Sequence, residues 1–323
     1  MTRRRFLAAG GAAVAAAQQE ELRDKALVGI SLDLEMSRNF PAWETTHWDY
    51  HKGDLNDESK KYTVEACRRV KAAGGVLHGF VVGQVLEHES VDWLTGIIRE
   101  GHPVGNHTYD HVNVKAKTLQ DVQFRFRRAP WLVQGKTPLE AIRENIVMNH
   151  RAMRARLGVD ADGFRTPGGF GNGLHDSPEV QQILLETGYT WCTAMAGGPS
   201  VQAGVVPSAS LYDEMEKAQA KYQPFVYPSG LIEVPMSPPS DIQAFRNGRW
   251  KLDYFLTAVR RGLSWAIENR AAYDFLSHPS CLYVMDPDFR AIDMICEMVH
   301  ASKGRARIVG LSEFARRAKE KRA

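Results

Sequence analysis

Short apolar segments alternate with amphipathic ones along this chain. The apolar segments are β-leaning, which is typical of strands covered on both faces. The amphipathic segments repeat their hydrophobic residues at helical spacing, and several end at glycine. This alternation predicts a parallel α/β fold. We expect strands at 26–34, 76–82, 103–104, 188–193, 231–236, 273–277 and 307–311, and helices at 61–73, 93–101, 138–157, 178–187, 212–222, 254–269 and 312–319.

Length and composition predict one large folded unit. The chain has 323 residues, 44% of them hydrophobic, and no repeat or linker divides it, so one α/β barrel accounts for the pattern. The net charge of +3 is small, and no long basic run carries interleaved aromatics, so no nucleic-acid partner is expected. The four cysteines lack C-x-x-C spacing, which argues against a zinc-thiolate site and favours buried thiols.

The first 17 residues are typical of an export signal. Paired arginines at 2–7 precede a weakly apolar Ala/Gly stretch, and residues 15–17 offer small side chains to a signal peptidase. The stretch is shorter than the roughly 20 residues that span a bilayer, so we expect a cleaved twin-arginine signal peptide and no stable membrane anchor. The alternative is a disordered basic N-terminus. A catalytic domain is then expected over 18–323, in the periplasm or secreted.

Two histidines four residues apart, His107 and His111, form the centre of the candidate chemistry. Side chains at this spacing share one side if the backbone is helical. Imidazole is a common ligand of zinc, and a catalytic zinc site takes about three protein ligands and keeps one position for water. The pattern therefore predicts a metal site. Alternatively, His107 caps a turn and His111 lies on a solvated helix face.

Two acids follow the first apolar segment. Asp33 and Glu35 point to the same face of an extended chain, where they could either work on a substrate or solvate the end of a strand. Arg165 precedes Pro167 and Gly168, a sequence that lets the backbone approach a ligand closely. A guanidinium can fix a carboxylate with two parallel hydrogen bonds and keep it ionised. The alternative is a surface arginine before a turn.

Two further segments could contact a ligand. The loop at 36–58 is rich in aromatic and histidine side chains, and it would lie on the face where barrels hold their active sites. Phe124 to Trp131 mixes arginines with aromatics and could line a groove for an anionic or glycan substrate. Packing of the loop on itself, and a solvated helix with core aromatics, are the respective alternatives.

These motifs resemble those of the polysaccharide deacetylase family, the NodB-type carbohydrate esterases. The resembling segments run from 26 to 279, and the resemblance implies a distorted, incomplete (β/α) barrel of about seven parallel strands. Four elements match. The strand at 76–84 matches the family pattern A-T-F-F-V-V-G-Q, and Glu100-Gly101-His102 with Gly105-Asn106 leads into the family's H-[ST]-x-x-H motif at His107 to His111. The family's R-x-P-x-G motif begins at Arg165, and its last motif matches the apolar strand that ends in Ser277-His278-Pro279.

The resemblance implies a metal site and a base. Asp33 is expected to act as the catalytic base, and Glu35 as the third metal ligand beside His107 and His111. The family's first motif is T-F-D-D-G, and Leu34 takes the place of its metal-binding aspartate. The roles of the two acids could therefore be exchanged. The expected metal is zinc, with cobalt, nickel or manganese as alternatives.

The resemblance also implies the remaining roles. Arg165 is expected to orient the catalytic aspartate, and a backbone N–H at Gly168, next to Pro167, to help hold an oxyanion. His278 is expected to be the general acid, since imidazole titrates near neutral pH. The family's fourth motif, an aspartate–tryptophan pair that lines the groove and tunes the acid, is not reproduced. Only Trp191 could stand in, and a core position is its alternative.

The expected activity is metal-dependent hydrolysis of an amide bond other than a peptide bond. The protein would remove N-acetyl groups, or O-acetyl groups, from a cell-wall or extracellular polysaccharide such as peptidoglycan. One alternative keeps the barrel but opens a cyclic amide such as allantoin. Another is a glycan-binding protein without turnover. The sequence leaves the polymer and the oligomeric state open.

Overall fold

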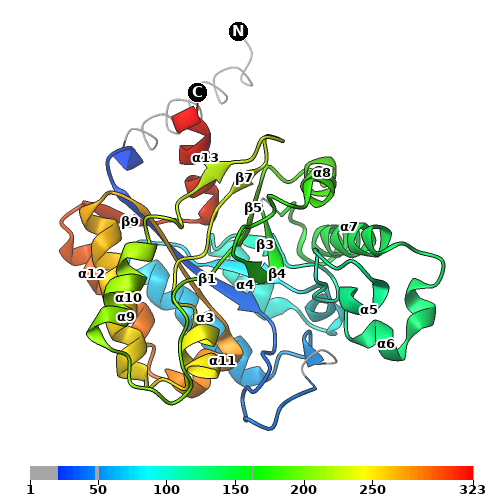
Figure 1. The fold of residues 1–323 in the computed structure, drawn as a ribbon, viewed down its shortest axis with the longest axis horizontal. Helices are drawn as coiled ribbons and strands as arrows, with labels where there is room; N and C mark the ends of the chain where they lie inside the picture. Colours follow the sequence, from blue (N-terminus) through cyan, green and yellow to red (C-terminus); the bar gives the residue numbers. More distant parts are fainter. Residues whose placement is uncertain (1–20, 48–50, 162, 323) are drawn as a thin grey trace.

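β1 (Ala26–Leu34) is the strand on which the sheet is built (Figure 1). In the computed structural model, which describes residues 21–47, 51–161 and 163–322, every residue of β1 is buried. The strand pairs in parallel with β2 (His78–Val81) and β8 (Ala272–Ser277), and its first residues pair with β9 (Ala306–Ile308). The expected signal peptide at 1–17 lies outside the described residues.

Seven parallel strands form an incomplete barrel in the order β8-β1-β2-β3-β4-β5-β7. The short β6 pairs antiparallel with β7, and within the described ranges no strand pairing joins β7 to β8. The predicted distorted, incomplete barrel of about seven parallel strands is therefore confirmed. The further strands are β3 (Val104–Asn106), β4 (Phe164–Phe170), β5 (Trp191–Met195), β6 (Phe225–Val226) and β7 (Ile232–Glu233).

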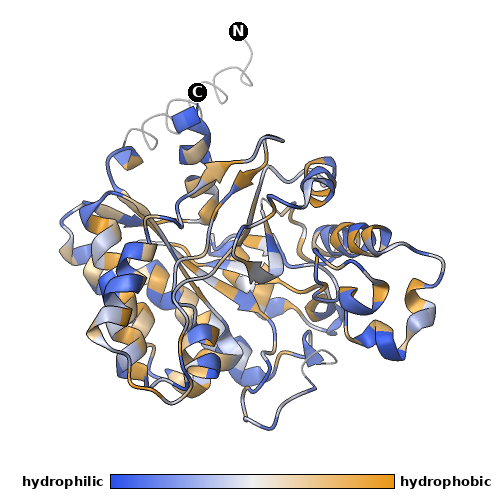
Figure 2. Cartoon of the chain, viewed as in Figure 1, coloured by the Kyte–Doolittle hydropathy of each residue, from blue (hydrophilic) through white to orange (hydrophobic). Residues whose placement is uncertain are grey.

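Helices surround the strands and turn their apolar faces inward (Figures 1 and 2). Burying one Leu, Ile or Phe side chain contributes about 1.5–3 kcal/mol, so this packing supplies much of the driving force for folding. The longer helices are α3 (Asp57–Ala72), α4 (Asp92–Arg99), α7 (Pro138–Leu157), α8 (Pro178–Thr187), α9 (Ala209–Ala218), α10 (Leu252–Glu268), α11 (Pro279–Met285), α12 (Arg290–Ala301) and α13 (Leu311–Arg322). Shorter turns are η1 (Gly83–Glu87), α5 (Leu119–Val122), α6 (Arg125–Arg128), η2 (Pro130–Val133) and the π-helix η3 (Ile242–Asn247).

Local sequence signals fix the ends of α7. The Thr137 side chain accepts a hydrogen bond from the Glu140 N–H, while the Glu140 carboxylate accepts one from the Thr137 N–H. Gly158 ends the helix in a left-handed conformation at φ 70°. None of the helices in the described part of the chain combines the length and apolarity that crossing a membrane requires.

The cysteines agree with the expectation of buried thiols. All four are free, and Cys67, Cys192 and Cys281 are buried while Cys296 is half-buried.

Candidate active site

A cavity of about 700 Å³ lies at the carboxyl ends of β1, β4 and β8. This is the end where barrels of alternating strands and helices hold their active sites. Its volume lies within the roughly 300–1,000 Å³ that is typical of ligand pockets. Asp33, Glu35, His111, Gly168 and His278 all line it.

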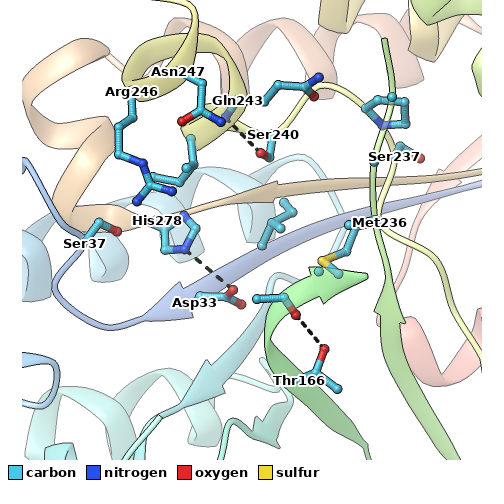
Figure 3. Close-up of a pocket in the computed structure, with 18 of the residues that line it drawn as sticks. Asp33, Ser37, Thr166, Met236, Ser237, Ser240, Gln243, Arg246, Asn247 and His278 are labelled. Carbon is cyan, nitrogen blue, oxygen red and sulfur yellow. Dashed lines mark hydrogen bonds and ion pairs between the residues drawn. The ribbon is translucent and has the colours of Figure 1, made fainter. Parts of the chain in front are cut away.

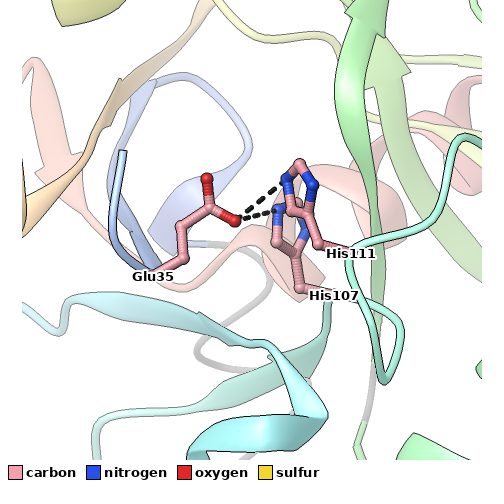
Figure 4. A group of neighbouring side chains, drawn as sticks. All are labelled: Glu35, His107 and His111. Atoms are coloured by element: carbon pink, nitrogen blue, oxygen red, sulfur yellow. Dashed lines mark ion pairs between the residues drawn. The ribbon is translucent and has the colours of Figure 1, made fainter. Parts of the chain in front are cut away.

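Glu35, His107 and His111 converge beside this cavity (Figure 4). The nitrogen and oxygen atoms that these side chains offer lie within 4.8 Å of one another. Glu35 Oε2 lies 2.9 Å from His111 Nε2 and 3.5 Å from His107 Nε2. Two imidazoles and one carboxylate match the donor set of a catalytic zinc site.

The loop that carries the histidines is not helical. Between β3 and α5 the backbone is not helical, and Thr108 and His111 both have left-handed φ angles, 58° and 56°. Side chains replace the helical hydrogen bonds: Asn106 Oδ1 accepts from the Thr108 N–H at 2.7 Å, and Thr108 Oγ1 accepts from the Val112 N–H at 3.0 Å. A side-chain-bonded loop therefore brings His107 and His111 together without the helical backbone that their spacing seemed to require.

Hydrogen bonding fixes the tautomer of His107. Its Nδ1 lies 3.0 Å from the Arg165 carbonyl oxygen, which can only accept, so Nδ1 carries the proton and Nε2 presents a lone pair to the cluster. That Nε2 is buried and, among the described residues, has no hydrogen-bond partner. A buried nitrogen aimed at a carboxylate and a second imidazole fits a divalent cation, so the donor set and its orphaned atom agree with a metal site.

Burial and neighbouring groups keep Glu35 and His111 in metal-binding protonation states. Burial, together with the Lys52 charge and the neighbouring His107 ring, lowers the pKa of His111 to about 4, so the His111 ring is neutral at neutral pH. Burial raises the pKa of Glu35, but the interactions with His111 and with the Lys52 ammonium outweigh burial and hold this pKa well below its usual range. A neutral imidazole and an ionised carboxylate are the forms that bind metal.

Lys52 is a buried cation that belongs to this site. It comes from the loop after β1, is 3% exposed, and forms a short ion pair with Glu35 Oε1. Because one oxygen of the carboxylate is held in this way, Glu35 presents Oε2 to the histidines.

Arg165 binds Asp33 and a second buried acid, Asp274. Its Nη1 donates to Asp33 Oδ1 at 2.9 Å, and its Nη2 donates to Asp274 Oδ2 at 2.7 Å, with all three side chains buried. Burial raises the pKa of Asp33, but the Arg165 charge and the neighbouring His107 and His278 rings outweigh it and lower the pKa below its usual value. Asp33 is therefore ionised. Its Oδ2 lies 3.7 Å from the Nε2 atoms of both His107 and His278.

His278 faces the acids from the end of β8. Its Nδ1 donates to Asp241 Oδ1 at 3.0 Å, and its backbone N–H donates to Asp241 Oδ2 at 2.7 Å. Nε2 is then directed at the cavity, 3.7 Å from Asp33 Oδ2 and 3.6 Å from Glu35 Oε1. Burial lowers the pKa of His278, but the charges of Asp241, Asp33 and Glu35 outweigh it and raise this pKa above its usual value. The ring can therefore hold a proton at neutral pH.

The glycine turn after Arg165 also reaches the cavity, whereas Trp191 does not. Gly168 has a φ of 76° and lines the cavity, and Pro167 lines an adjoining pocket. Trp191 is the first residue of β5, at the opposite end of the barrel. It is 2% exposed and packs edge-on against His78 and Phe80. The prediction that Trp191 lines the substrate groove was wrong, because it fills the core beneath the strands.

The two aromatic-rich segments contribute less than their composition suggested. From the described part of 36–58, Ser37, Arg38 and Lys52 line the cavity, whereas Trp43 packs against Arg249 with the guanidinium 3.2 Å from the ring centroid. Trp48 and Tyr50 lie outside the described residues. The segment at 119–133 forms short turns, and only residues 120–124 and Arg127 of it line the adjoining pocket.

Sequence reasoning did not find three charged residues of the site. Asp274 carried a usable signal, because a lone acid inside the apolar strand 272–277 needs a buried partner. Asp241 and Lys52 lie in irregular segments, and no pattern in the sequence marks them. Asp241 accepts the hydrogen bond from His278 Nδ1 and so fixes which ring nitrogen carries this proton. In the family, the fourth motif, which is missing here, is expected to tune this histidine.

The comparisons with known proteins agree with this geometry. Residues 52–191 match the family model described as polysaccharide deacetylase, which confirms the resemblance seen in the motifs. The matched range includes His107, His111 and Arg165, and it leaves out the β1 acids and His278. Among curated proteins, none matches this chain.

One of the similar solved structures, the first below, shows the fold. A candidate polysaccharide deacetylase from Mycobacterium smegmatis superposes with a TM-score of 0.61 at 16% identity, over 93% of this chain and 92% of that protein. A CE4-family pseudoenzyme from Bacillus anthracis gives a TM-score of 0.47 at 16% identity, over 91% of this chain and 66% of that one. The peptidoglycan deacetylase from Bacillus subtilis gives 0.44 at 12% identity, over 93% and 95%.

Proposed function

Starting from the polysaccharide deacetylase fold of this chain, we propose that the protein is a metal-dependent deacetylase that removes N-acetyl groups from a polysaccharide. One observation carries the proposal: Glu35, His107 and His111 meet within 4.8 Å, beside the cavity that Asp33 and His278 line. A bound divalent cation would supply Lewis acidity and an activated water. Glu35, His107 and His111 would hold it.

The other residues supply the proton chemistry. Asp33 takes a proton from the attacking water, and Arg165 keeps it ionised for that purpose. Gly168 offers its backbone N–H to the oxygen that becomes negative. His278 donates a proton from Nε2 to the departing sugar amine, while Asp241 fixes the opposite side of the ring. Asp33 lies on β1 and His278 directly follows β8, so the base and the acid are separate residues.

The geometry favours one assignment of the two acids. Glu35 lies 2.9 Å from His111 Nε2 and belongs to the ligand cluster. Asp33 is tied to Arg165 and lies 3.7 Å from His107 Nε2, which suits a base better than a ligand. We therefore assign Glu35 as the ligand and Asp33 as the base.

Acetate release tests the proposal. Zinc-loaded protein should free acetate from at least one of peptidoglycan, chitin oligomers and acetylxylan, and metal analysis should find about one cation per chain. The His107→Ala variant should lose both the metal and the activity. The His150→Ala variant is the matched control, because His150 lies on α7 outside the cavity. Metal binding without acetate release from any of these substrates would overturn the deacetylase assignment and favour cyclic-amide hydrolysis or glycan binding.

We also propose export by the twin-arginine route. The support is the sequence at 2–7 and the small residues at 15–17. A double Arg3→Lys, Arg4→Lys variant should remain in the cytoplasm, whereas a Lys25→Arg variant, with the same kind of change beyond the signal, should be exported. Equal export of both variants would contradict this route.

A further inference from the structure

One wall of the cavity carries hydrogen-bond donors that the proposed deacetylation does not use. Arg246 lies in η3, Arg38 and Ser37 lie in the loop after β1, and all three line the same cavity as His278. Figure 3 shows Ser37, Arg246 and His278 on one side of it. The question is what these donors bind.

Arg246 lacks the partner that other arginines of the protein have. Its Nε is buried and has no hydrogen-bond acceptor among the described residues. Across the same described ranges, no ion pair joins Arg246 to a carboxylate, whereas Arg165 and Arg261 each contact two. Burial lowers the pKa of Arg246, and repulsion from the Arg38 charge lowers it further. A half-buried cation beside a like charge favours an anion on its open side.

Ser37 adds a second donor of the same kind. The residue is 2% exposed, and its Oγ is buried with no hydrogen-bond partner in the described part of the protein. Its backbone N–H is already held by Ser280 Oγ at 3.0 Å, so the backbone of Ser37 is fixed. Buried donors without acceptors are rare in folded proteins, and two of them lining one cavity indicate a ligand.

The nearby carboxylates are occupied elsewhere. Asp241 accepts both the Nδ1–H and the backbone N–H of His278, and Glu35 pairs with Lys52 and His111. Their charges raise the pKa of Arg246, but by less than burial and the Arg38 charge lower it. Neither neutralises the guanidinium by direct contact.

We propose that Arg246, with Ser37 and with Arg38 at the rim, forms a subsite that binds a carboxylate carried by the glycan, so that the preferred substrate is an acidic N-acetylated sugar. The assignment rests on the proposed function, because the same cavity contains the deacetylation site. A planar guanidinium binds a carboxylate with two parallel hydrogen bonds, and the serine hydroxyl can donate a third. Both parts of the substrate would be held in one cavity of about 700 Å³.

Substrate preference tests this subsite. Zinc-loaded full-length protein would be assayed for acetate release from oligomers that contain N-acetylmuramic acid, which carries a carboxylate, and from neutral chitin oligomers. In Arg246→Gln the ratio of kcat/KM for the acidic over the neutral substrate should fall by at least about tenfold, through KM for the acidic substrate. Arg246→Lys should restore part of the ratio, and Ser37→Ala should lower it by a smaller factor.

Arg249→Gln is the matched control. Arg249 lies three residues further along, is exposed, packs on Trp43 and does not line the cavity. Its substitution removes the same charge and should leave the ratio unchanged. An Arg246→Gln variant that loses activity equally on both substrates would show a purely structural role and overturn the subsite, as would a wild-type protein that prefers the neutral oligomer.

Binding separates this proposal from the proposed function. If wild-type protein released acetate from neither substrate, the deacetylase assignment would fail, and calorimetry of the metal-free protein with the same oligomers would still decide the subsite. Tighter binding of the acidic oligomer that is lost in Arg246→Gln supports the carboxylate site. Equal binding of both oligomers overturns it.

Discussion

Replacing Arg165 by methionine would remove the single cation that two buried carboxylates share. Asp33 and Asp274 contact its guanidinium at 2.9 and 2.7 Å, and the side chains of Arg165 and Asp274 are fully buried. Removing one partner of a buried ion pair costs about 3–5 kcal/mol, because the remaining charge is left without compensation. We expect Arg165→Met to lower the free energy of unfolding by this amount at about pH 7.

The loss should shrink in acid. Burial already raises the pKa of Asp274 in the wild type, although Arg165 opposes this shift, and it lifts the pKa of Asp33 less than its neighbours lower it. Without Arg165 the pKa of Asp274 should rise further and that of Asp33 should rise above its value in the unfolded chain, so the folded variant takes up more protons than the wild type as the pH falls. Stability then rises by about 1.4 kcal/mol per pH unit for each extra proton that the folded state holds. Between about pH 7 and about pH 5 the variant should regain about 1–3 kcal/mol relative to the wild type. The wild type keeps the stability from its depressed Asp33 pKa over this range and loses it only as the pH falls through that folded-state pKa.

Urea unfolding of metal-free protein at the two pH values measures this effect. Arg317→Met is the matched control: Arg317 donates to the Lys25 carbonyl at 2.6 Å, and no ion pair joins it to a carboxylate within the described residues. The control should lose stability by the same amount at both pH values. If the deficit of Arg165→Met were also independent of pH, the two carboxylates would not depend on this arginine for their charge, and the electrostatic reasoning would be refuted.

Three more predictions concern the proton and metal chemistry. Asp241→Asn removes the charge that holds the His278 pKa up, so the alkaline limb of the kcat/KM profile, where the acid loses its proton, should move to lower pH; an unmoved limb would contradict the proposed general acid. Lys52→Met frees the second oxygen of Glu35 and should weaken zinc binding about 10–100-fold in a competition with a chromophoric chelator, and unchanged affinity would show that Lys52 does not position this ligand. Free zinc at about 100 times its Kd should add about 2.7 kcal/mol to the free energy of unfolding, and an unchanged thermal midpoint would argue against a native metal site.

Hydrophobic periodicity predicted most of the fold. The limits expected for β1, α7 and α8 agree with the structure because local signals set them: a run of buried β-formers in the first case, and proline starts with glycine ends in the other two. α12 was missed although its apolar positions follow helical spacing. The strand expected at 231–236 is shorter, Ile232–Glu233, because only these two residues pair with β5 and β6.

The site could be predicted where its residues follow strands. Asp33, His107 and His278 come at or directly after the carboxyl ends of parallel strands, and such ends meet at one edge of a barrel. Asp241 and Lys52 could not be placed, since they reach the site from irregular segments whose path depends on tertiary packing. The His107–His111 spacing suggested a helix, and the side chains of Asn106 and Thr108 imposed a loop instead.

The π-helix η3 carries two residues with different roles in the site. Asp241 caps this turn and Arg246 lies within it. The residue that orients His278 and the residue proposed to bind the substrate carboxylate are therefore held by the same short segment. A π turn contains one residue more than an α turn, so deleting one residue between them would close the π turn to an α turn and change the height at which Arg246 meets the cavity, while Asp241 stayed in place. A relative with that deletion would keep its hydrolytic chemistry and change the polymers it accepts. Selectivity in this architecture can therefore diverge by a single codon, without any substitution among the ligands or the acid–base pair.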